Sequence, residues 1–442
     1  MPNIIRKMWG NLNSLVESRP LLILTAILTI TLIRAIIFVV HNPPSLASGE
    51  TDSWWVIALN LLHGDGYSLC LAKYFPFCAV TNQTTAMREP IPVLFFATVA
   101  RLGQESLWSA TIIELVIYML IPVLLFCLTK EWANTFSALI AAAFWAIYLP
   151  ALDLIPQVSS DLLAALFVTA GILMTLKARK TLRKRDWLIA SIWLGLAAMS
   201  RSATLVIGIV LIGGQGIEFL QRRIKFEEVI KPTLMITSSM ILFMAPWLIR
   251  NQIELGKPIL GSSLVGYNLY RHNYMIGTNS YLRYVGGIEG YQATQNLISS
   301  RPGELVGTEN EAQMDSFYRK EAIKIISAHP FRYLQLAAYR FLPLWFNWKV
   351  LEAYGIPTGH HGYIIMGIQA LFLVLACIEV GFHARRTWPL WGSIALLSLA
   401  YMTVDSQLLY LTPVIPLLIS MSAGGAEKLL RQIVLPGAGI VP

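Results

Sequence analysis

The chain has 442 residues, of which 55% are hydrophobic and only 13% are charged, whereas an ordinary soluble domain has about 45–50% and about 25%. Apolar runs of about 18 residues or more recur along it and exclude an ordinary soluble enzyme, a disordered chain, a collagen and a disulfide-rich mini-protein. The formal net charge of +9 would suggest nucleic-acid binding in a soluble protein. In a membrane protein, however, basic residues first report topology, so we expect the lipid bilayer and not a nucleic acid as the partner.

Segments long and apolar enough to cross the bilayer are predicted along most of the chain. They lie near 20–40, 107–129, 134–153, 158–176, 187–200, 203–220, 232–250, 362–382, 388–404 and 407–425. We therefore expect an all-α integral membrane protein with about ten transmembrane helices, in a range of about 8–12. Two large extracytoplasmic loops, 41–106 and 251–361, should carry short amphipathic helices.

The basic residues favour one orientation of these spans. If the N-terminus is cytoplasmic, strict alternation places more than half of the 34 Lys and Arg residues in short inner segments. The short outer connections near 153–158, 201 and 405 then carry only Arg201. The positive-inside rule predicts cytoplasmic N- and C-termini in the plasma (cell inner) membrane, with the active site outside.

The division of the chain follows from this topology. We expect an N-terminal membrane module over 1–250 that includes the loop 41–106. A large extracytoplasmic loop over 251–361 and C-terminal membrane helices with a short cytoplasmic tail over 362–442 should follow. The apolar stretch 331–349 contains three basic residues and several aromatic residues, which favours an interfacial helix bent at Pro343 over another span.

The first outer loop begins with a predicted helix. Thr51 has the character of an N-cap, apolar residues follow at 55, 58, 59 and 62, and Gly64-Asp65-Gly66 should end the helix. Asp52 lies in its first turn, close to the end of a span. Its carboxylate has two interpretations, a functional group or a capping group that complements the helix dipole.

A second polar element precedes a Pro-x-Pro sequence that returns to the membrane. Arg88 and Glu89 lie directly before Pro90. Arg is the side chain best suited to bidentate phosphate binding. A plain interfacial Arg is the alternative.

The seventh span runs into the large loop through Trp247, Arg250 and Asn251. Interfacial anchoring explains such an ending as well as ligand binding does. A cluster able to hydrogen-bond sugar hydroxyls and phosphates follows. It comprises Tyr267, Asn268, Arg271 and His272.

The cysteines and histidines suggest few further features. Cys70 and Cys78 share the first outer loop, where an oxidising compartment would allow a disulfide, and free thiols are the alternative. Neither His272 nor the pair at 360 and 361 comes with carboxylates at ligand spacing. We therefore predict no metal and no cofactor.

The order of several short motifs resembles the GT-C membrane glycosyltransferases. The similarity is to the branch of protein O-mannosyltransferases and lipid A aminoarabinose transferases. The motifs are ALNLLHGDGYS at 58–68, AMREPIP at 86–92, Ser160-Asp161, GLAAMSR at 195–201, APWLIRN at 245–251, YRKEAIKIISAHP at 318–330 and TPVIP at 412–416.

The resemblance implies a polyprenyl-phosphate sugar donor, transfer on the outer face, and an acceptor that stays unidentified. Carried onto this sequence, Asp52 becomes the general base and Arg88 stabilises the leaving phosphate. Arg201 and Arg250 are further candidates for the same phosphate. The sequence departs from the pattern before the last Pro-x-x-Pro, where an Arg is common and this chain has Asp405.

A transporter or flippase of a lipid-linked sugar is the rival class. Transporters usually scatter ionisable residues through their spans, whereas here such residues concentrate in the outer loops. This distribution favours the enzyme. A non-catalytic scaffold is a third class, in which Asp52 would be dispensable.

Overall fold

The computed structural model describes residues 10, 14–47, 50–72, 74–78, 83–283, 285–301, 303–346 and 360–434. These residues form an α-helical molecule with no β-strand, apart from an isolated bridge between Ser68 and Thr84. The helices of the N-terminal half are α2 (Pro20–His41), α3 (Thr51–His63), α4 (Pro90–Leu102), α5 (Leu107–Trp132), α6 (Thr135–Ile147), α7 (Leu149–Asp153), α8 (Asp161–Thr181), α9 (Lys184–Ser200), η1 (Ser202–Thr204) and α10 (Leu205–Leu220).

The C-terminal half continues the same architecture. Its helices are α11 (Phe226–Leu255), α12 (Val265–Arg271), η2 (Tyr274–Gly277), α13 (Gly287–Ser299), α14 (Glu311–Ala328), α15 (Pro330–Tyr339), α16 (Phe341–Phe346), α17 (His360–His383), α18 (Trp388–Val404), η4 (Leu408–Val414) and α19 (Ile415–Val434).

Seven helical segments of the described chain are long and apolar enough to cross a membrane. They confirm a multi-pass membrane protein and coincide with predicted spans. Helices also occupy the other three predicted positions, 134–153, 187–200 and 388–404. Each of these helices is shorter than the about 20 residues that cross a bilayer. The number of about ten spans therefore stays a prediction. The predicted inner charges Arg6 and Lys7 lie outside the described residues.

The membrane core is built around α19, which is the most buried of the seven. Helix α19 packs against α17 and α6, while α8 packs against α9 and α5. Small residues permit these close approaches, since a Cβ added at Gly425 would lie 2.0 Å from the backbone oxygen of Leu375. By contrast, α2 is mostly exposed, as expected for a helix that faces lipid.

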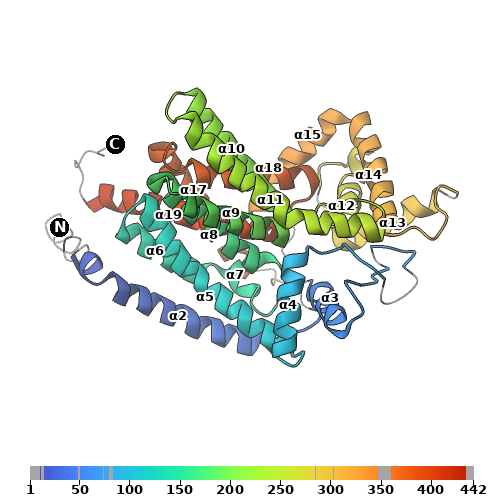
Figure 1. The fold of residues 1–442 in the computed structure, drawn as a ribbon, viewed down its shortest axis with the longest axis horizontal. Helices are drawn as coiled ribbons and strands as arrows, with labels where there is room; N and C mark the ends of the chain where they lie inside the picture. Colours follow the sequence, from blue (N-terminus) through green and yellow to red (C-terminus); the bar gives the residue numbers. More distant parts are fainter. Residues whose placement is uncertain are drawn as a thin grey trace.

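A second apolar core joins the helices of the two predicted outer loops. It contains Trp54 and Trp55 of α3, Phe96 of α4, Tyr267 of α12 and Tyr318 of α14. Figure 1 shows α3, α12, α13 and α14 gathered at one end of the long-helix bundle. The two loops, far apart in the sequence, therefore fold together.

Helix α11 connects the membrane bundle to this end. Its 30 residues span about 45 Å, which exceeds the about 30 Å of hydrocarbon in a bilayer. Arg250 and Asn251 lie in its last turns, and it ends at Gly256, whose φ of 73° is left-handed. The long helix thus carries Arg250 to the end of the bundle where α3 lies.

The predicted interfacial segment is helical but breaks earlier than expected. Helix α15 ends at Tyr339 and α16 starts at Phe341, so the break is at Arg340 and not at Pro343. The reason is that a proline ring clashes with the carbonyl four residues before it, here that of Tyr339. Residues 347–349 of this predicted segment lie outside the described residues.

Candidate functional site

Asp52 lies in the first turn of α3, with an exposed side chain. Its Oδ1 accepts a hydrogen bond from the Ser53 N–H, 2.7 Å away. The helix ends as predicted at Gly64, whose φ of 91° is left-handed. Asp52 therefore presents a carboxylate from a helix terminus that is fixed by the buried residues on either side of it.

The predicted N-cap role of Thr51 is wrong. The N-cap position is Glu50, and Thr51 is the first residue of the helix, with a fully buried side chain. Its Oγ1 instead accepts a hydrogen bond from the backbone N–H of Val158, 2.9 Å away. The hydroxyl therefore bonds a residue that is distant in sequence and does not cap its own helix.

Arg88 is in contact with the same helix start. Its Nε donates to the Ser53 Oγ at 2.9 Å, and its guanidinium carbon lies 5.1 Å from the centre of the Trp54 ring. Its Nη1 pairs with Glu50 Oε2 at 2.8 Å. The structure thus brings Arg88 to the residue adjacent to Asp52, a proximity that the sequence separation of 36 residues did not reveal.

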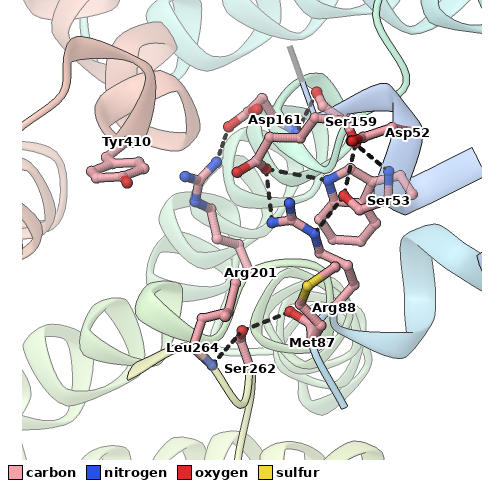
Figure 2. Close-up of polar contacts among 12 residues, drawn as sticks. Asp52, Ser53, Met87, Arg88, Ser159, Asp161, Arg201, Ser262, Leu264 and Tyr410 are labelled. Carbon is pink, nitrogen blue, oxygen red and sulfur yellow. Dashed lines mark hydrogen bonds and ion pairs between the residues drawn. The ribbon is translucent and has the colours of Figure 1, made fainter. Parts of the chain in front are cut away.

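Glu50 is the acidic partner that the sequence analysis did not include in the site. Desolvation raises the pKa of its carboxyl. The charges of Arg88 and Arg201 and the hydrogen bonds from Arg88 and Trp54 together lower it by more, so the pKa of Glu50 is below its usual value. Glu50 is therefore a carboxylate held near two guanidinium groups. Figure 2 shows Asp52, Ser53 and Arg88 on one side of this region and Arg201 with Asp161 on the other.

Arg201 pairs with Asp161, the first residue of α8. Its Nε donates to the Tyr401 hydroxyl at 3.0 Å, and its guanidinium carbon lies 5.2 Å from the centre of the Tyr410 ring. The rings of Tyr401 and Tyr410 are stacked with centres 4.8 Å apart. Four elements, α8, the end of α9, the end of α18 and η4, therefore meet at Arg201.

Glu89 and Arg250 have structural partners. Oε1 of Glu89 accepts hydrogen bonds from the N–H and hydroxyl of Ser202, at 3.1 and 2.9 Å. Arg250 donates to the backbone oxygens of Thr85 and Tyr67, at 2.7 and 3.1 Å. Glu89 therefore links the start of α4 to η1, which follows α9. Arg250 holds the first outer loop by hydrogen bonds to its backbone.

The predicted cluster at 267–272 lies on α12 and just after it. Tyr267 is fully buried and packs edge-on against Tyr318, while Asn268 is half-buried. Arg271 lies with its guanidinium carbon 5.6 Å from the centre of the Tyr267 ring. These residues belong to the core of the outer loops as much as to any binding surface.

His272 is buried beside Asp405. Asp405 is the residue found where the resemblance predicts an Arg. Nε2 of His272 lies 3.0 Å from Oδ2 of Asp405 and 2.7 Å from Nε of Arg271. Desolvation, together with the charges of Arg271 and Arg340, outweighs the attraction of Asp405 and lowers the pKa of His272 to about 4. His272 is therefore neutral near pH 7.

Three side chains from the α11–α14 region hold the segment that presents Arg88, and the sequence analysis missed two of them. Arg250 binds the Thr85 oxygen, Glu311 Oε2 accepts from the Ala86 N–H at 2.8 Å, and the Ser262 hydroxyl donates to the Met87 oxygen at 2.6 Å. Glu311 also binds the hydroxyls of Thr85 and Ser263. Asn310 and Gln313 form the capping box of α14, a local signal that the sequence analysis did not use and that would have placed Glu311 at the start of a helix.

Cys70 and Cys78 are paired in the structure, with Cα atoms 5.7 Å apart, a separation usual for a disulfide. The other two cysteines, Cys127 and Cys377, are unpaired. Among the described residues, no group of three or more His, Cys, Asp or Glu side chains is arranged to hold a metal ion.

Part of this chain is similar in sequence to a known family, and its fold is similar to that of solved structures. Residues 88–249 match the model of the dolichyl-phosphate-mannose-protein mannosyltransferases. The chain is also similar to solved structures of the oligosaccharyltransferase of Archaeoglobus fulgidus. For its apo form the TM-score is 0.54 at 13% identity, covering 93% of this chain and 51% of that one.

The chain therefore has the fold of the archaeal oligosaccharyltransferase, and its segment 88–249 is similar to the dolichyl-phosphate-mannose-protein mannosyltransferases. For the archaeal enzyme bound to an inhibitory peptide and a dolichol-phosphate, the TM-score is 0.52 at 14% identity, over 92% of this chain and 50% of that one. The structure tethered to an acceptor peptide with an NVT sequon gives 0.52 at 13% identity, with the same coverage. The chain spans about half the length of these proteins, and no curated protein matches it.

The GT-C resemblance predicted from the motifs is thus confirmed by the family match over 88–249 and by the fold. Arg88 is the first residue of the segment that matches the mannosyltransferase model, and Asp161 and Arg201 lie within it. Asp52 precedes that segment. The mannosyltransferase model therefore covers Arg88 and Arg201 but neither Arg250 nor the candidate base.

Proposed function

We propose that the chain transfers a sugar from a polyprenyl-phosphate-linked donor to an acceptor on the extracytoplasmic face of the membrane. The acceptor is a lipid, a glycan or a protein. The observation that carries the proposal is the contact between Arg88 and Ser53, 2.9 Å, which brings a phosphate-binding side chain beside an exposed carboxylate. Within this proposal, the termini are cytoplasmic and the membrane is the plasma membrane.

In the proposed reaction, Asp52 takes the proton of an acceptor hydroxyl as its oxygen attacks the anomeric carbon of the donor. The bond between that carbon and the phosphate oxygen breaks, and the lipid phosphate leaves with the electron pair. Arg88 stabilises the charge that develops on the phosphate. Arg201, on the other side of the site, is the second proposed phosphate contact.

The predicted division of the chain fits this chemistry. In it, 1–250 supplies Asp52, Arg88 and Arg201, and Ser262 and Glu311 of the loop 251–361 hold the segment before Arg88. Tyr267, Asn268, Arg271 and His272 stay proposed donor-contacting residues. The helices of 362–442 contribute Tyr401 and Tyr410, which contact Arg201.

Asp52→Asn tests the proposed base. Asn is nearly isosteric and still accepts the hydrogen bond of the Ser53 N–H, so a merely local role predicts a loss of about 1 kcal/mol or less of stability and an active protein. A general base predicts a rate lower by about 10²–10⁴-fold with folding and donor binding preserved. The measurement is sugar transfer from a polyprenyl-phosphate sugar by purified protein in nanodiscs.

Glu105→Gln is the matched control, because Glu105 is an exposed carboxylate of the same loop. Near-normal turnover by Asp52→Asn would contradict the assignment of the base, and Glu50, Asp65 and Glu89 would then be the remaining acidic candidates in that loop. The rival function, movement of a lipid-linked sugar across the membrane, predicts translocation without transfer. Wild-type protein that moves the donor between leaflets but never forms product would support that rival.

A further inference from the structure

Arg88 is enclosed by three contacts of unequal strength. Ser53 and Trp54, which hold its Nε and one face of its guanidinium, are almost fully buried in α3. Glu50 holds Nη1 at 2.8 Å, yet its side chain is 48% exposed while that of Arg88 is only 10% exposed. Of these three partners, Glu50 can therefore leave without opening the core.

The carboxylate of Glu50 also interacts electrostatically with a second arginine, Arg201. The charge of Arg201 contributes with that of Arg88 to the lowering of its pKa, so the carboxylate lies in the field of both guanidinium groups. The sugar donor is a phosphodiester, which has one negative charge like a carboxylate, but the lipid phosphate that leaves it is a monoester with more negative charge than a carboxylate and one more acceptor oxygen. The leaving monoester would therefore compete well for a position between two arginines.

We propose that the carboxylate of Glu50 occupies the position that the lipid phosphate takes as it leaves the sugar, and that this phosphate displaces it toward solvent. The inference rests on the proposed function, because it takes a polyprenyl phosphate as the ligand. Without that ligand, Glu50 keeps a nearly buried Arg88 paired, which avoids the cost of an unpaired buried charge. Only a ligand that pairs with the arginines better than a carboxylate does can displace it, so Glu50 acts as a filter for phosphate monoesters.

The alternative is that Glu50 is a permanent clamp that fixes Arg88 for the donor. The two roles predict opposite effects of Glu50→Gln on binding. Loss of a competitor tightens phosphate binding, whereas loss of a clamp weakens it. The amide still accepts a hydrogen bond from Arg88, so the variant keeps the local packing.

The probe is farnesyl monophosphate, and its dissociation constant is measured by equilibrium titration of the full chain in nanodiscs. We expect Glu50→Gln to bind it about 3–5-fold more tightly than wild type, the effect expected when a half-exposed ion pair no longer competes. Glu105→Gln is the control, because it removes the same charge from an exposed pair with His63 in the same region. Its affinity should change less than about twofold. Unchanged or weaker binding by a monodisperse Glu50→Gln protein would overturn the proposal.

A double variant shows whether the effect acts through Arg88. In an Arg88→Gln background, Glu50→Gln should give no gain, since Glu50 then has no guanidinium to release. A gain that persists without Arg88 would mean a general change of charge and would also overturn the proposal. The sugar-transfer assay separates the two hypotheses: transfer without a gain in Glu50→Gln contradicts only the filter, and a gain without transfer by any protein contradicts only the proposed function.

Discussion

The hydroxyl of Thr51 accepts a hydrogen bond from the backbone N–H of Val158 at 2.9 Å, and both residues are almost fully buried. This bond joins the start of the helix that carries Asp52 to the turn before Asp161. The candidate base and the acidic partner of Arg201 are therefore fixed relative to each other through one side chain. Two parts of the site that are about 100 residues apart depend on it.

Thr51→Val should destabilise the protein and disturb the site. Valine has nearly the same shape but leaves the Val158 N–H without an acceptor, which costs about 1–3 kcal/mol. Thermal unfolding in nanodiscs should show a lower midpoint. Thr98→Val is the control, since the exposed Thr98 hydroxyl bonds only within its own helix. Equal midpoints for the two variants would show that the Thr51 bond is unimportant.

Cys70 and Cys78 should be linked in the mature protein. Non-reducing mass spectrometry of a tryptic digest should find the two joined, with Cys127 and Cys377 free. A bridge over a loop this short stabilises by about 2–3 kcal/mol in the chain-entropy model, so Cys70→Ser should lower the unfolding midpoint. Alkylated, unlinked thiols at both positions in protein from an oxidising compartment would contradict the bridge.

The orientation of the chain can be tested with reporter fusions. A reporter after Arg185, in the first turn of α9, should read cytoplasmic, and one inserted near Gly290, in α13, should read extracytoplasmic. The reason is the segregation of Lys and Arg in the short connections. A cytoplasmic signal near Gly290 would reverse the topology and place the candidate site on the wrong side of the membrane.

Much of the fold followed from local pattern. Long apolar runs predicted the positions of the membrane helices, because each span must contain its own backbone hydrogen bonds. The end of α3 was also readable, since Gly64 is a local signal. Its start was misplaced by one residue, because the Thr51 hydroxyl bonds Val158 and does not cap the helix. The break at Arg340 was misplaced by three residues because proline acts on the carbonyl of an earlier turn.

The pairings within the site could not be predicted from local pattern. Arg88 and Arg201 were each proposed as phosphate ligands, but their partners Glu50 and Asp161 lie 38 and 40 residues away in sequence. The role of Glu311 depends on a contact across 225 residues. Arg250 was predicted as a phosphate ligand from its place at the end of a span, and its hydrogen bonds to the backbone oxygens of Tyr67 and Thr85 could not be read from the sequence.

His272 predicts a pH dependence of stability. Its pKa is about 6.5 when unfolded and about 4 in the folded chain, so between these values the unfolded state binds more protons. Its stabilising contribution is therefore complete above about pH 6.5 and lost as the pH falls toward about 4, by about 3 kcal/mol in all. His272→Gln should show a shallower fall of the unfolding midpoint over this range than wild type. Parallel curves would contradict a neutral buried His272.

Glu311 should control donor affinity through Arg88. Its two carboxylate oxygens accept from the Ala86 N–H and from the hydroxyls of Thr85 and Ser263, which fixes the chain two residues before Arg88. In Glu311→Gln an amide NH₂ replaces one of these acceptors, so at least one buried donor loses its partner, at about 1–3 kcal/mol. We expect a lower unfolding midpoint and a raised KM for the donor, with a smaller change in kcat, because the phosphate contact is displaced while Asp52 is not.

The control for this variant is Glu304→Gln, which removes an exposed carboxylate just before α14 whose pair with Arg301 is long, at 3.8 Å. It should leave the midpoint and the donor KM unchanged. A Glu311→Gln protein with a lower midpoint but an unchanged KM would mean that the segment before Arg88 is held well enough by Arg250 and Ser262 alone. A lower kcat at constant KM would mean that Glu311 acts on the base side of the site, through α3, and not on the phosphate.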